Sequence, residues 1–400
     1  MIRSRIPIIL VLPLLVLLAC RPPLEGPRLV VVISVDQMRA DYLERFDDRF
    51  TGGFARLLRD GAVFADAHQD HAKTSTAPGH ATIATGAFPA RHGVVQNDWY
   101  DRTTGRTVYS VQDQTAQILG IPDAPGRSPI NMKTNTLGDW LKRRSRGSKV
   151  FSVAFKDRAA ITMGGKRPNG VYWYYLPTGQ IVTSSYYRRE YPDWVDRFNS
   201  AEPAAAYDGR NWERLFPEST YVASREDDFP PEFDGRSTIF PHWIGMMEED
   251  GGWNRFFEKI LPRSPFADEL TFTFVRELVV NEDLGTDDRP DILFVGCSAA
   301  DYIGHIYGPY SQEVEDYYLR LDRQLDSLFV FLDQTVGRAN YMVVLTADHG
   351  VMTMPEELAR RGFGGERASK RAVGTLAKQA IGADTATSEP DQGPQVRIIS

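Results

Sequence analysis

Residues 29–35, LVVVISV, form a continuous apolar run that is followed directly by Asp36. Three further apolar runs of similar length also end ahead of a charged residue: KVFSVAF (149–155, before Lys156), DILFVG (291–296, leading to Asp301) and YMVVLTA (341–347, before Asp348). Unbroken runs of Val, Ile, Leu and Phe indicate strands that are buried on both faces.

Helical patterns lie between these predicted strands, at residues 54–61 (FARLLRDG), 134–144 (TNTLGDWLKRR) and 314–332 (VEDYYLRLDRQLDSLFVFL). In the last of these, apolar residues recur at spacings of three, four and seven, which is the period of a helix. Strands that alternate with helices predict an α/β chain. In open α/β sheets, ligands bind outside the carboxyl ends of the strands, where this sequence repeatedly places a charged residue.

The overall composition and the N-terminus restrict partners and location. The chain has 400 residues, a formal net charge of -7 and no block of lysine and arginine, which argues against a nucleic-acid partner. Residues 1–20 predict a signal peptide, because arginines precede a short apolar run. This run ends in LLAC and resembles a bacterial lipobox, so we expect a lipid anchor at Cys20 and a periplasmic protein; an ordinary signal peptide is the alternative. Cys297 is the one other cysteine, and no intrachain disulfide is expected.

Residues 164–261 differ in texture from the rest of the chain, because they are rich in aromatic residues and proline. We expect this segment to be an inserted cap subdomain over the site. The catalytic domain would then consist of residues 29–163 and 262–400. The alternative is a long excursion that packs elsewhere.

Carboxylates and histidines cluster after three of the predicted strands. Asp301 and His305 in DYIGH are four residues apart, so on a helix they lie on one face and can share a cation. TADHG adds Asp348 and His349, and Asp36 follows the first strand. Oxygen and imidazole ligands without thiolate suit zinc or another first-row divalent ion, and two clusters indicate two ions. Taken alone, an Asp and a His at this spacing are more often surface neighbours.

The stretch TSTAPGHATIATG, residues 74–86, predicts a helix that starts near Ala77, with Thr76 as its N-cap and Pro78 in its first turn. Free backbone N–H groups at a helix start attract phosphate. The Thr76 hydroxyl becomes a nucleophile if a metal or a base lowers its pKa, and the alternative is a plain N-cap. We expect His80 to pack or hydrogen-bond beside this stretch.

Six motifs resemble, in this order, the type I phosphodiesterase and nucleotide pyrophosphatase branch of the alkaline phosphatase superfamily. Most narrowly, they resemble its phosphate-irrepressible bacterial alkaline phosphatases. The motifs are VVVISVDQMRADYLERF, STAPGHATIATGAFPARHGVVQNDWYD, SVAFKDRAAI, YYLPTGQIVTSSYY, CSAADYIGHIYGPYSQEVEDYYLRLD and YMVVLTADHGV. The resemblance extends from about residue 29 to about residue 362. It implies an alkaline-phosphatase-like fold with a central, mostly parallel sheet flanked by helices.

The resemblance also implies roles for individual residues, and Thr76 is implied to be the nucleophile. The implied ligands of one zinc ion are Asp36, Thr76, Asp348 and His349, and those of the second are Asp301 and His305. Asn97, Lys156 and Arg158 are implied to contact phosphoryl oxygens. We expect Lys156 and Arg158 to point the same way, because residues two apart at the end of an extended strand do so.

These implied roles predict a hydrolase of phosphate monoesters that uses two Zn²⁺ ions, acts on a small phosphate ester and forms a phosphothreonine at Thr76. Monoesters are favoured because two cations can neutralise the additional anionic oxygen of a monoester dianion. A nucleotide pyrophosphatase or phosphodiesterase is the alternative within the family. The family places a further histidine on the second zinc, but none follows His349. We therefore expect a sequence truncated after Ser400, and the alternative of another class is a non-catalytic lipoprotein.

Overall fold

A six-stranded sheet forms the centre of the molecule in the computed structural model, which describes residues 26–245, 260–368 and 370–380. The strand order is β10-β1-β9-β4-β5-β6, and every neighbouring pair is parallel except β5 and β6. The strands are β1 (Leu29–Val35), β4 (Val150–Ala154), β5 (Gly170–Tyr175), β6 (Gln180–Val182), β9 (Asp291–Cys297) and β10 (Tyr341–Thr346). The predicted α/β fold with a mostly parallel sheet is confirmed.

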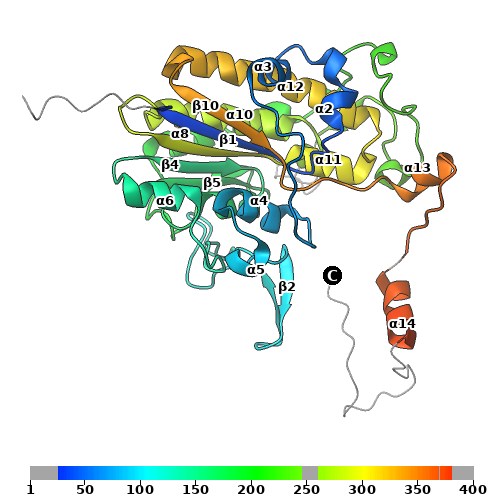
Figure 1. Ribbon diagram of the computed structural model, residues 1–400, viewed down its shortest axis with the longest axis horizontal. Coiled ribbons are helices and arrows are strands. Elements are labelled where there is room, and N and C mark those ends of the chain that lie inside the picture. Colours follow the sequence, from blue (N-terminus) through cyan, green and yellow to red (C-terminus); the bar gives the residue numbers. More distant parts are fainter. Residues whose placement is uncertain (1–25, 246–259, 369, 381–400) are drawn as a thin grey trace, which may run out of the picture.

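Helices cover both faces of this sheet (Figure 1). On one side lie α3 (Gly53–Asp60), α10 (Phe266–Asn281), α11 (Ala299–Tyr307) and α12 (Gln312–Leu332). On the other side lie α4 (Thr76–Thr85), α6 (Leu137–Arg144) and α7 (Asp157–Gly164). The three predicted helical patterns correspond to α3, α6 and α12, and a capping box at Thr136 fixes the start of α6.

The remaining elements are short, and most lie in the connections. They are α2 (Tyr42–Arg45), η2 (Asp47–Arg49), α5 (Pro89–His92), β2 (Asp98–Asp101), β3 (Arg106–Tyr109), α8 (Asp193–Ser200), η3 (Pro203–Tyr207), β7 (Arg210–Trp212), η4 (Glu218–Thr220), η5 (Glu232–Gly235), β8 (His242–Ile244), η6 (Leu261–Arg263), η7 (Asp333–Gly337), α13 (Pro355–Arg360) and α14 (Lys370–Ala380). None of the helices in the described ranges is long and apolar enough to cross a membrane.

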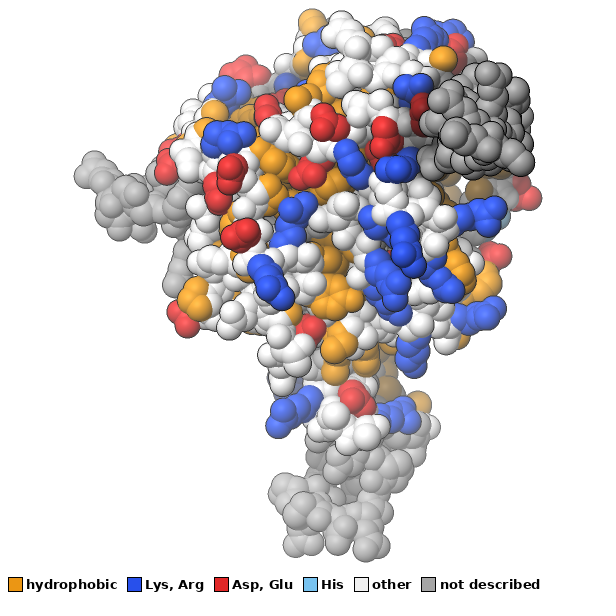
Figure 2. Space-filling view, turned by 90° about the vertical axis from the view of Figure 1, so that its left-hand side faces the viewer, with side chains coloured by type: hydrophobic (Ala, Val, Ile, Leu, Met, Phe, Trp, Pro, Cys, Tyr) orange, Lys and Arg blue, Asp and Glu red, His pale blue; other side chains and the backbone are white. Residues whose placement is uncertain are grey.

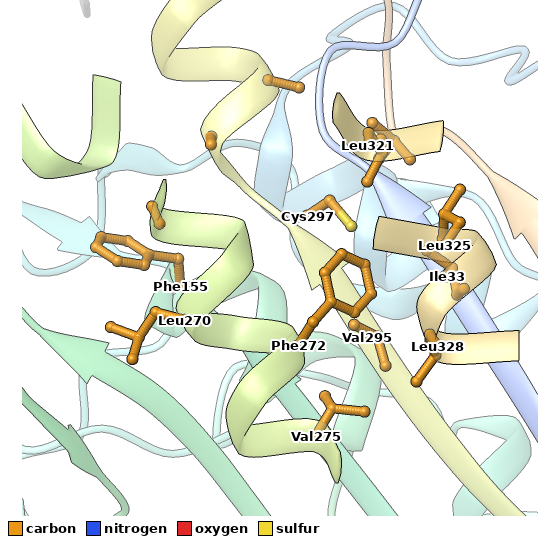
Figure 3. Packing of buried hydrophobic residues seen from close by; sticks show 14 of the residues in the cluster. Ile33, Phe155, Leu270, Phe272, Val275, Val295, Cys297, Leu321, Leu325 and Leu328 are labelled. Carbon is orange, nitrogen blue, oxygen red and sulfur yellow. The ribbon is translucent and has the colours of Figure 1, made fainter. Parts of the chain in front are cut away.

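The main hydrophobic core lies between the sheet and the helices α10 and α12 (Figure 3). Phe272 of α10 and Leu325 of α12 pack against Ile33 and Val295 of the central strands. Cys297 belongs to the same cluster and is fully buried. Because apolar neighbours surround it, burial raises the pKa of its thiol well above the usual value.

The four apolar runs of the sequence form β1, β4, β9 and β10, four of the five parallel strands, but their burial differs. All residues of β4 and β9 are buried, as expected for inner strands. In β10, Met342 and Val344 remain 47% and 40% exposed. The expected burial on both faces is therefore wrong for β10, because it lies at the sheet edge, where β1 is its one partner in the sheet.

The segment predicted as a cap contains part of the sheet. Strands β5 and β6 lie inside residues 164–261 and extend the central sheet next to β4, so the predicted cap boundary at residue 164 is wrong. Aromatic residues such as Tyr172 and Trp173 are buried there as core residues, which explains the aromatic texture. Further along, buried hydrogen bonds join Trp212 and His242 to α12 through Asp316 and Glu313. A cap role for this later part stays a prediction.

Candidate active site

The carboxyl ends of β1, β9, β4 and β10 meet at one edge of the sheet, because these strands are parallel neighbours. Asp36 directly follows β1, Asp348 follows β10, Asp301 lies in the first turn of α11 behind β9, and Lys156 follows β4. The Lys156 Nζ lies 2.7 Å from Asp36 Oδ2 and also contacts Asp301 Oδ2. Residues up to about 310 positions apart in the chain thus form one buried polar site.

A first cluster consists of Asp36, Asp348 and His349, whose ligand atoms all lie within 4.8 Å of one another. His349 Nε2 lies 3.4 Å from Asp36 Oδ1 and 3.5 Å from Asp348 Oδ2. The other ring nitrogen, Nδ1, lies 2.8 Å from the carbonyl oxygen of Gly350. A proton on Nδ1 would be held by this contact and would leave Nε2 free to bind a metal.

A second cluster consists of Asp301 and His305, which lie one turn apart on α11 with His305 Nε2 3.1 Å from Asp301 Oδ1. The prediction that they share one face of a helix is confirmed. Asp301 is 5% exposed, while the side chain of His305 is 65% exposed. The two clusters adjoin, because His349 Nε2 is 4.0 Å from Asp301 Oδ1.

Three buried carboxylates meet at this site, those of Asp36, Asp301 and Asp348, and the buried ammonium of Lys156 contacts the first two. Burial and the carboxylate of Asp348 raise the pKa of Asp36 well above its usual range, against the opposing charge of Lys156. Burial also acts to raise the pKa of Asp301, but the charge of Lys156 outweighs it and holds that pKa below its usual range. Such a site favours the binding of cations.

Two carboxylate oxygens of the first cluster, Asp36 Oδ1 and Asp348 Oδ2, accept no hydrogen bond from the residues that the structure describes. His80 Nδ1 lies 3.1 Å from Asp348 Oδ2, but it is closer to the carbonyl oxygen of Thr76, at 2.8 Å. The N–H at Nδ1 therefore donates to the carbonyl oxygen of Thr76. The prediction that His80 hydrogen-bonds beside this stretch is confirmed. Buried, unpartnered oxygens beside an imidazole fit a divalent cation.

Thr76 is the first residue of α4, and Ser75, with φ -153° and ψ 167°, is the N-cap. The sequence placed the N-cap one residue too late, at Thr76. The side chain of Ser75 makes no capping bond, so nothing in its local pattern distinguished it from its neighbour. Thr76 is 2% exposed.

The side chain of Asn97 lies against the first turn of α4. Its Oδ1 accepts a hydrogen bond of 2.8 Å from the backbone N–H of Ala77. The residue directly precedes β2, and its carbonyl accepts a bond from Ser110, which follows β3, so the base of the β2–β3 hairpin holds it. The side-chain amide of Asn97 is therefore fixed beside Thr76.

We expected Lys156 and Arg158 to lie at the end of an extended strand, and this expectation is wrong. Strand β4 ends at Ala154, Lys156 is the N-cap of α7, and Arg158 lies in its first turn. Lys156 Nζ lies 4.9 Å from the centre of the Tyr302 ring. Burial acts to lower the pKa of Arg158, but the hydroxyl groups of Tyr109 and Tyr302 and the carboxylate of Asp157 outweigh it and raise that pKa.

Sequence reasoning missed the partners of these residues, such as Tyr302, Tyr109 and Gln37. Gln37 donates hydrogen bonds to carboxylates of both clusters. A tyrosine or glutamine next to a candidate ligand is common in any sequence, so no local signal marks it. The contacts become visible when distant segments are brought together by the fold.

Comparison with known proteins identifies the family of this chain. The family model "Type I phosphodiesterase / nucleotide pyrophosphatase" matches residues 30–379. Alkaline phosphatase PhoV of Synechococcus elongatus is 39% identical over 345 residues, which are 85% of this chain and 62% of PhoV. Alkaline phosphatase PafA of Elizabethkingia meningoseptica is 38% identical over 371 residues, which are 90% of this chain and 66% of PafA. This chain thus spans less than two thirds of the length of both relatives.

Solved structures show the same likeness. The crystal structure of wild-type PafA matches with a TM-score of 0.82 and 37% identity, covering 91% of this chain and 70% of the PafA chain. A PafA variant in which a threonine, an asparagine, a lysine and an arginine are substituted matches with a TM-score of 0.83.

Proposed function

Because this chain belongs to the type I phosphodiesterase and nucleotide pyrophosphatase family, we propose that it hydrolyses phosphate monoesters as a zinc-dependent alkaline phosphatase. Relatives that are 38% and 39% identical over most of this chain are named alkaline phosphatases. The observation that carries the proposal is the first cluster, whose unpartnered oxygens lie beside the helix start that holds Thr76. The meeting of three buried carboxylates supports a site for cations.

Asp36, Asp348 and His349 would hold one zinc ion together with Thr76, and Asp301 and His305 would hold the second. When bound, the two ions supply positive charge that offsets the phosphate and lowers the pKa of the threonine hydroxyl. The residues fit such ions, because carboxylate and imidazole are ligands that zinc accepts.

Thr76 would act as the nucleophile. Its Oγ1 would lose its proton and form a bond to phosphorus, the bond from phosphorus to the ester oxygen would break, and that oxygen would take up a proton and leave as the alcohol. Water would then hydrolyse the phosphothreonine to release phosphate. The backbone N–H groups at the start of α4 favour negative charge near Thr76, and the fixed amide of Asn97 would donate to a phosphoryl oxygen.

Lys156 and Arg158 would contact the remaining phosphoryl oxygens, and they are the basis for preferring monoesters. A monoester dianion presents an additional anionic oxygen to these cations, whereas a diester fills that position with an organic group. The substituted PafA variant supports the choice of residues, since it changes the four residue types found here at Thr76, Asn97, Lys156 and Arg158. Diester or pyrophosphate hydrolysis remains the second candidate because the family includes such enzymes.

Cys20 would carry the lipid anchor of a periplasmic protein, although residues 1–25 lie outside the described residues. The chain enters β1 on the left of Figure 1, at the end of the strand opposite the site. Figure 2 shows that Lys and Arg side chains gather on this face. Basic side chains on this face would suit an anionic surface on the side of the molecule opposite the site.

The proposal is tested by phosphate release from an aryl phosphate monoester after the chain is supplied with zinc. We expect Thr76→Ala to lower turnover by at least about 10³-fold, because the nucleophile is lost. Thr85→Ala on the same helix is the matched control, since its hydroxyl bonds to Ala81 within the helix, and should retain activity. Unchanged turnover in the Thr76 variant would sink the proposed mechanism. A chain that binds zinc without any turnover would instead favour the non-catalytic lipoprotein.

A further inference from the structure

Gln37 occupies an unusual backbone conformation between the two clusters. It directly follows Asp36 in the turn that ends β1, where the N–H of Met38 bonds to the carbonyl of Val35. Its φ of 66° lies in the left-handed region, which favours glycine. The side chain is nevertheless well buried, with 3% of the residue exposed. A glycine would serve this turn at least as well, so the reason for a glutamine must lie in its side chain.

Two hydrogen bonds give that reason. The backbone N–H of Gln37 donates to Asp348 Oδ1 at 3.0 Å, and the side-chain Nε2 donates to Asp301 Oδ1 at 2.9 Å. One residue therefore contacts a carboxylate of the first cluster and a carboxylate of the second. Since a carboxylate accepts and does not donate, the nitrogen of the side-chain amide must be the atom that faces Asp301.

Helix α11 leaves room for this amide at Gly304. A Cβ at residue 304 would lie 2.0 Å from Gln37 Oε1, so a side chain there would force the amide of Gln37 to move. The absence of a side chain at Gly304 thus lets Gln37 reach Asp301, which lies one turn earlier on the same helix. The contact is therefore built from both sides, by the turn after β1 and by the glycine of α11.

We propose that Gln37 is a positioning residue that fixes Asp301 relative to Asp348 and thereby sets the affinity of the second metal site. This inference rests on the proposed two-metal function. Hydrogen bonds to a ligating carboxylate orient it, and losing one typically weakens metal binding by about 10- to 100-fold. The backbone bond to Asp348 does not depend on the side chain, so the first site should keep its affinity when the side chain is changed.

Two variants separate the effect of the amide donor from the effects of side-chain volume and of backbone conformation. Gln37→Met keeps the length and removes the donor, whereas Gln37→Gly removes the donor and relieves the left-handed backbone. Zinc affinities of the purified chain are measured by competition with a chromophoric chelator, and the unfolding temperature is measured without metal. We expect both variants to bind the second zinc ion about 10- to 100-fold more weakly and the first with unchanged affinity. The metal-free Gln37→Met chain should still unfold cooperatively.

Glu202→Gly is the matched control, because Glu202 also has a positive φ, of 47°, but is exposed and lies at the start of η3. It should leave both zinc affinities unchanged. Wild-type protein that binds fewer than two zinc ions would overturn the two-metal proposal, and this inference with it, before any variant is compared. Wild-type protein with two ions, together with variants whose second affinity stays within twofold, would overturn the inference alone. A loss confined to Gln37→Gly would assign the effect to packing and would also overturn it.

Discussion

Gly79 lies directly against Asp348. A Cβ at residue 79 would be 2.2 Å from the carbonyl oxygen of Asp348 and 2.8 Å from its Cβ. This contact brings α4, which carries Thr76, against the loop that carries two residues of the first cluster. The distance between the nucleophile and the candidate metal ligands therefore depends on the absence of a side chain at residue 79.

We expect Gly79→Ala to impair the site although alanine favours helices. The added methyl group would meet backbone atoms that cannot rotate away, so α4 must shift, at a cost of about 1–3 kcal/mol. Activity on an aryl phosphate and zinc retention should both fall, and unfolding in urea should occur at a lower concentration. Gly364→Ala is the control, because nothing lies within 4 Å of a Cβ at that residue. Full activity of the Gly79 variant would show that the close approach is not needed.

Lys156 gives a prediction about substrate preference. In Lys156→Met the charge is lost at nearly constant length, and the rate on a monoester should fall by about 100-fold or more, since a charged contact to the transferred group is removed. A bis-aryl phosphate has one anionic oxygen fewer to neutralise and should be affected less. The ratio of kcat/KM for the two substrates measures this difference.

The control for that experiment is Lys166→Met, which changes a half-buried lysine that follows α7 and lies outside the site. Breaking a buried ion pair is also destabilising by roughly 3–5 kcal/mol. Folding of the Lys156 variant must therefore be verified by its unfolding temperature. Equal losses on both substrates would argue against a role of Lys156 in selecting monoesters.

Zinc should stabilise the folded chain through the first cluster. A ligand that binds only the folded state, at a free concentration 100 times its dissociation constant, adds about 2.7 kcal/mol to the free energy of unfolding. We therefore expect a chelator to lower the unfolding temperature and zinc to restore it. His349→Ala should abolish most of this shift, whereas His68→Ala, which removes an exposed histidine paired with Asp66, should not. A shift of the same size in all three proteins would place the zinc elsewhere.

The sequence predicted the parts of the site that lie next to strong local signals. Asp36, Asp301 and Asp348 follow apolar runs that form strands, and the parallel order of these strands brings their carboxyl ends to one edge of the sheet. Strand β5 was missed because aromatic residues dominate it, and β6, with the sequence QIV, is only three residues long. A strand of buried aromatic residues looks locally like any other aromatic segment.

Contacts between distant segments could not be predicted. Gln37 and Asp301 are 264 residues apart, and their hydrogen bond depends on a backbone turn and on a glycine in another helix. The error in predicting Thr76 instead of Ser75 as the N-cap has a different cause, because serine and threonine are both common at that position, serine somewhat more so. The prediction that Lys156 and Arg158 lie on an extended strand was wrong because β4 already ends at Ala154 and α7 starts at Asp157.

Asp268 of α10 supports the helix that carries the second cluster. Its carboxylate accepts hydrogen bonds from the backbone N–H groups of Ser298 and Ala299, each at 3.0 Å, at the start of α11. The hydroxyl of Tyr317 donates a third bond, at 2.7 Å. Burial raises the pKa of Asp268 from 3.8 to about 6, against these three hydrogen bonds.

The raised pKa fixes the sign of a pH effect on stability. Between pH 3.8 and about 6 the unfolded chain has released the proton of Asp268 while the folded chain still holds it, so rising pH favours unfolding in this window. Across this pH window we expect the free energy of unfolding of the wild-type protein to fall by a few kcal/mol relative to that of Asp268→Asn, because asparagine does not titrate. Because an amide offers one acceptor for three donors, Asp268→Asn should also be less stable by about 1–3 kcal/mol at pH 4. Urea unfolding at pH 4 and pH 7 measures both differences. Asp288→Asn, at an exposed aspartate, is the control. If the stability of wild type and of Asp268→Asn changes with pH in parallel, the raised pKa of Asp268 is refuted.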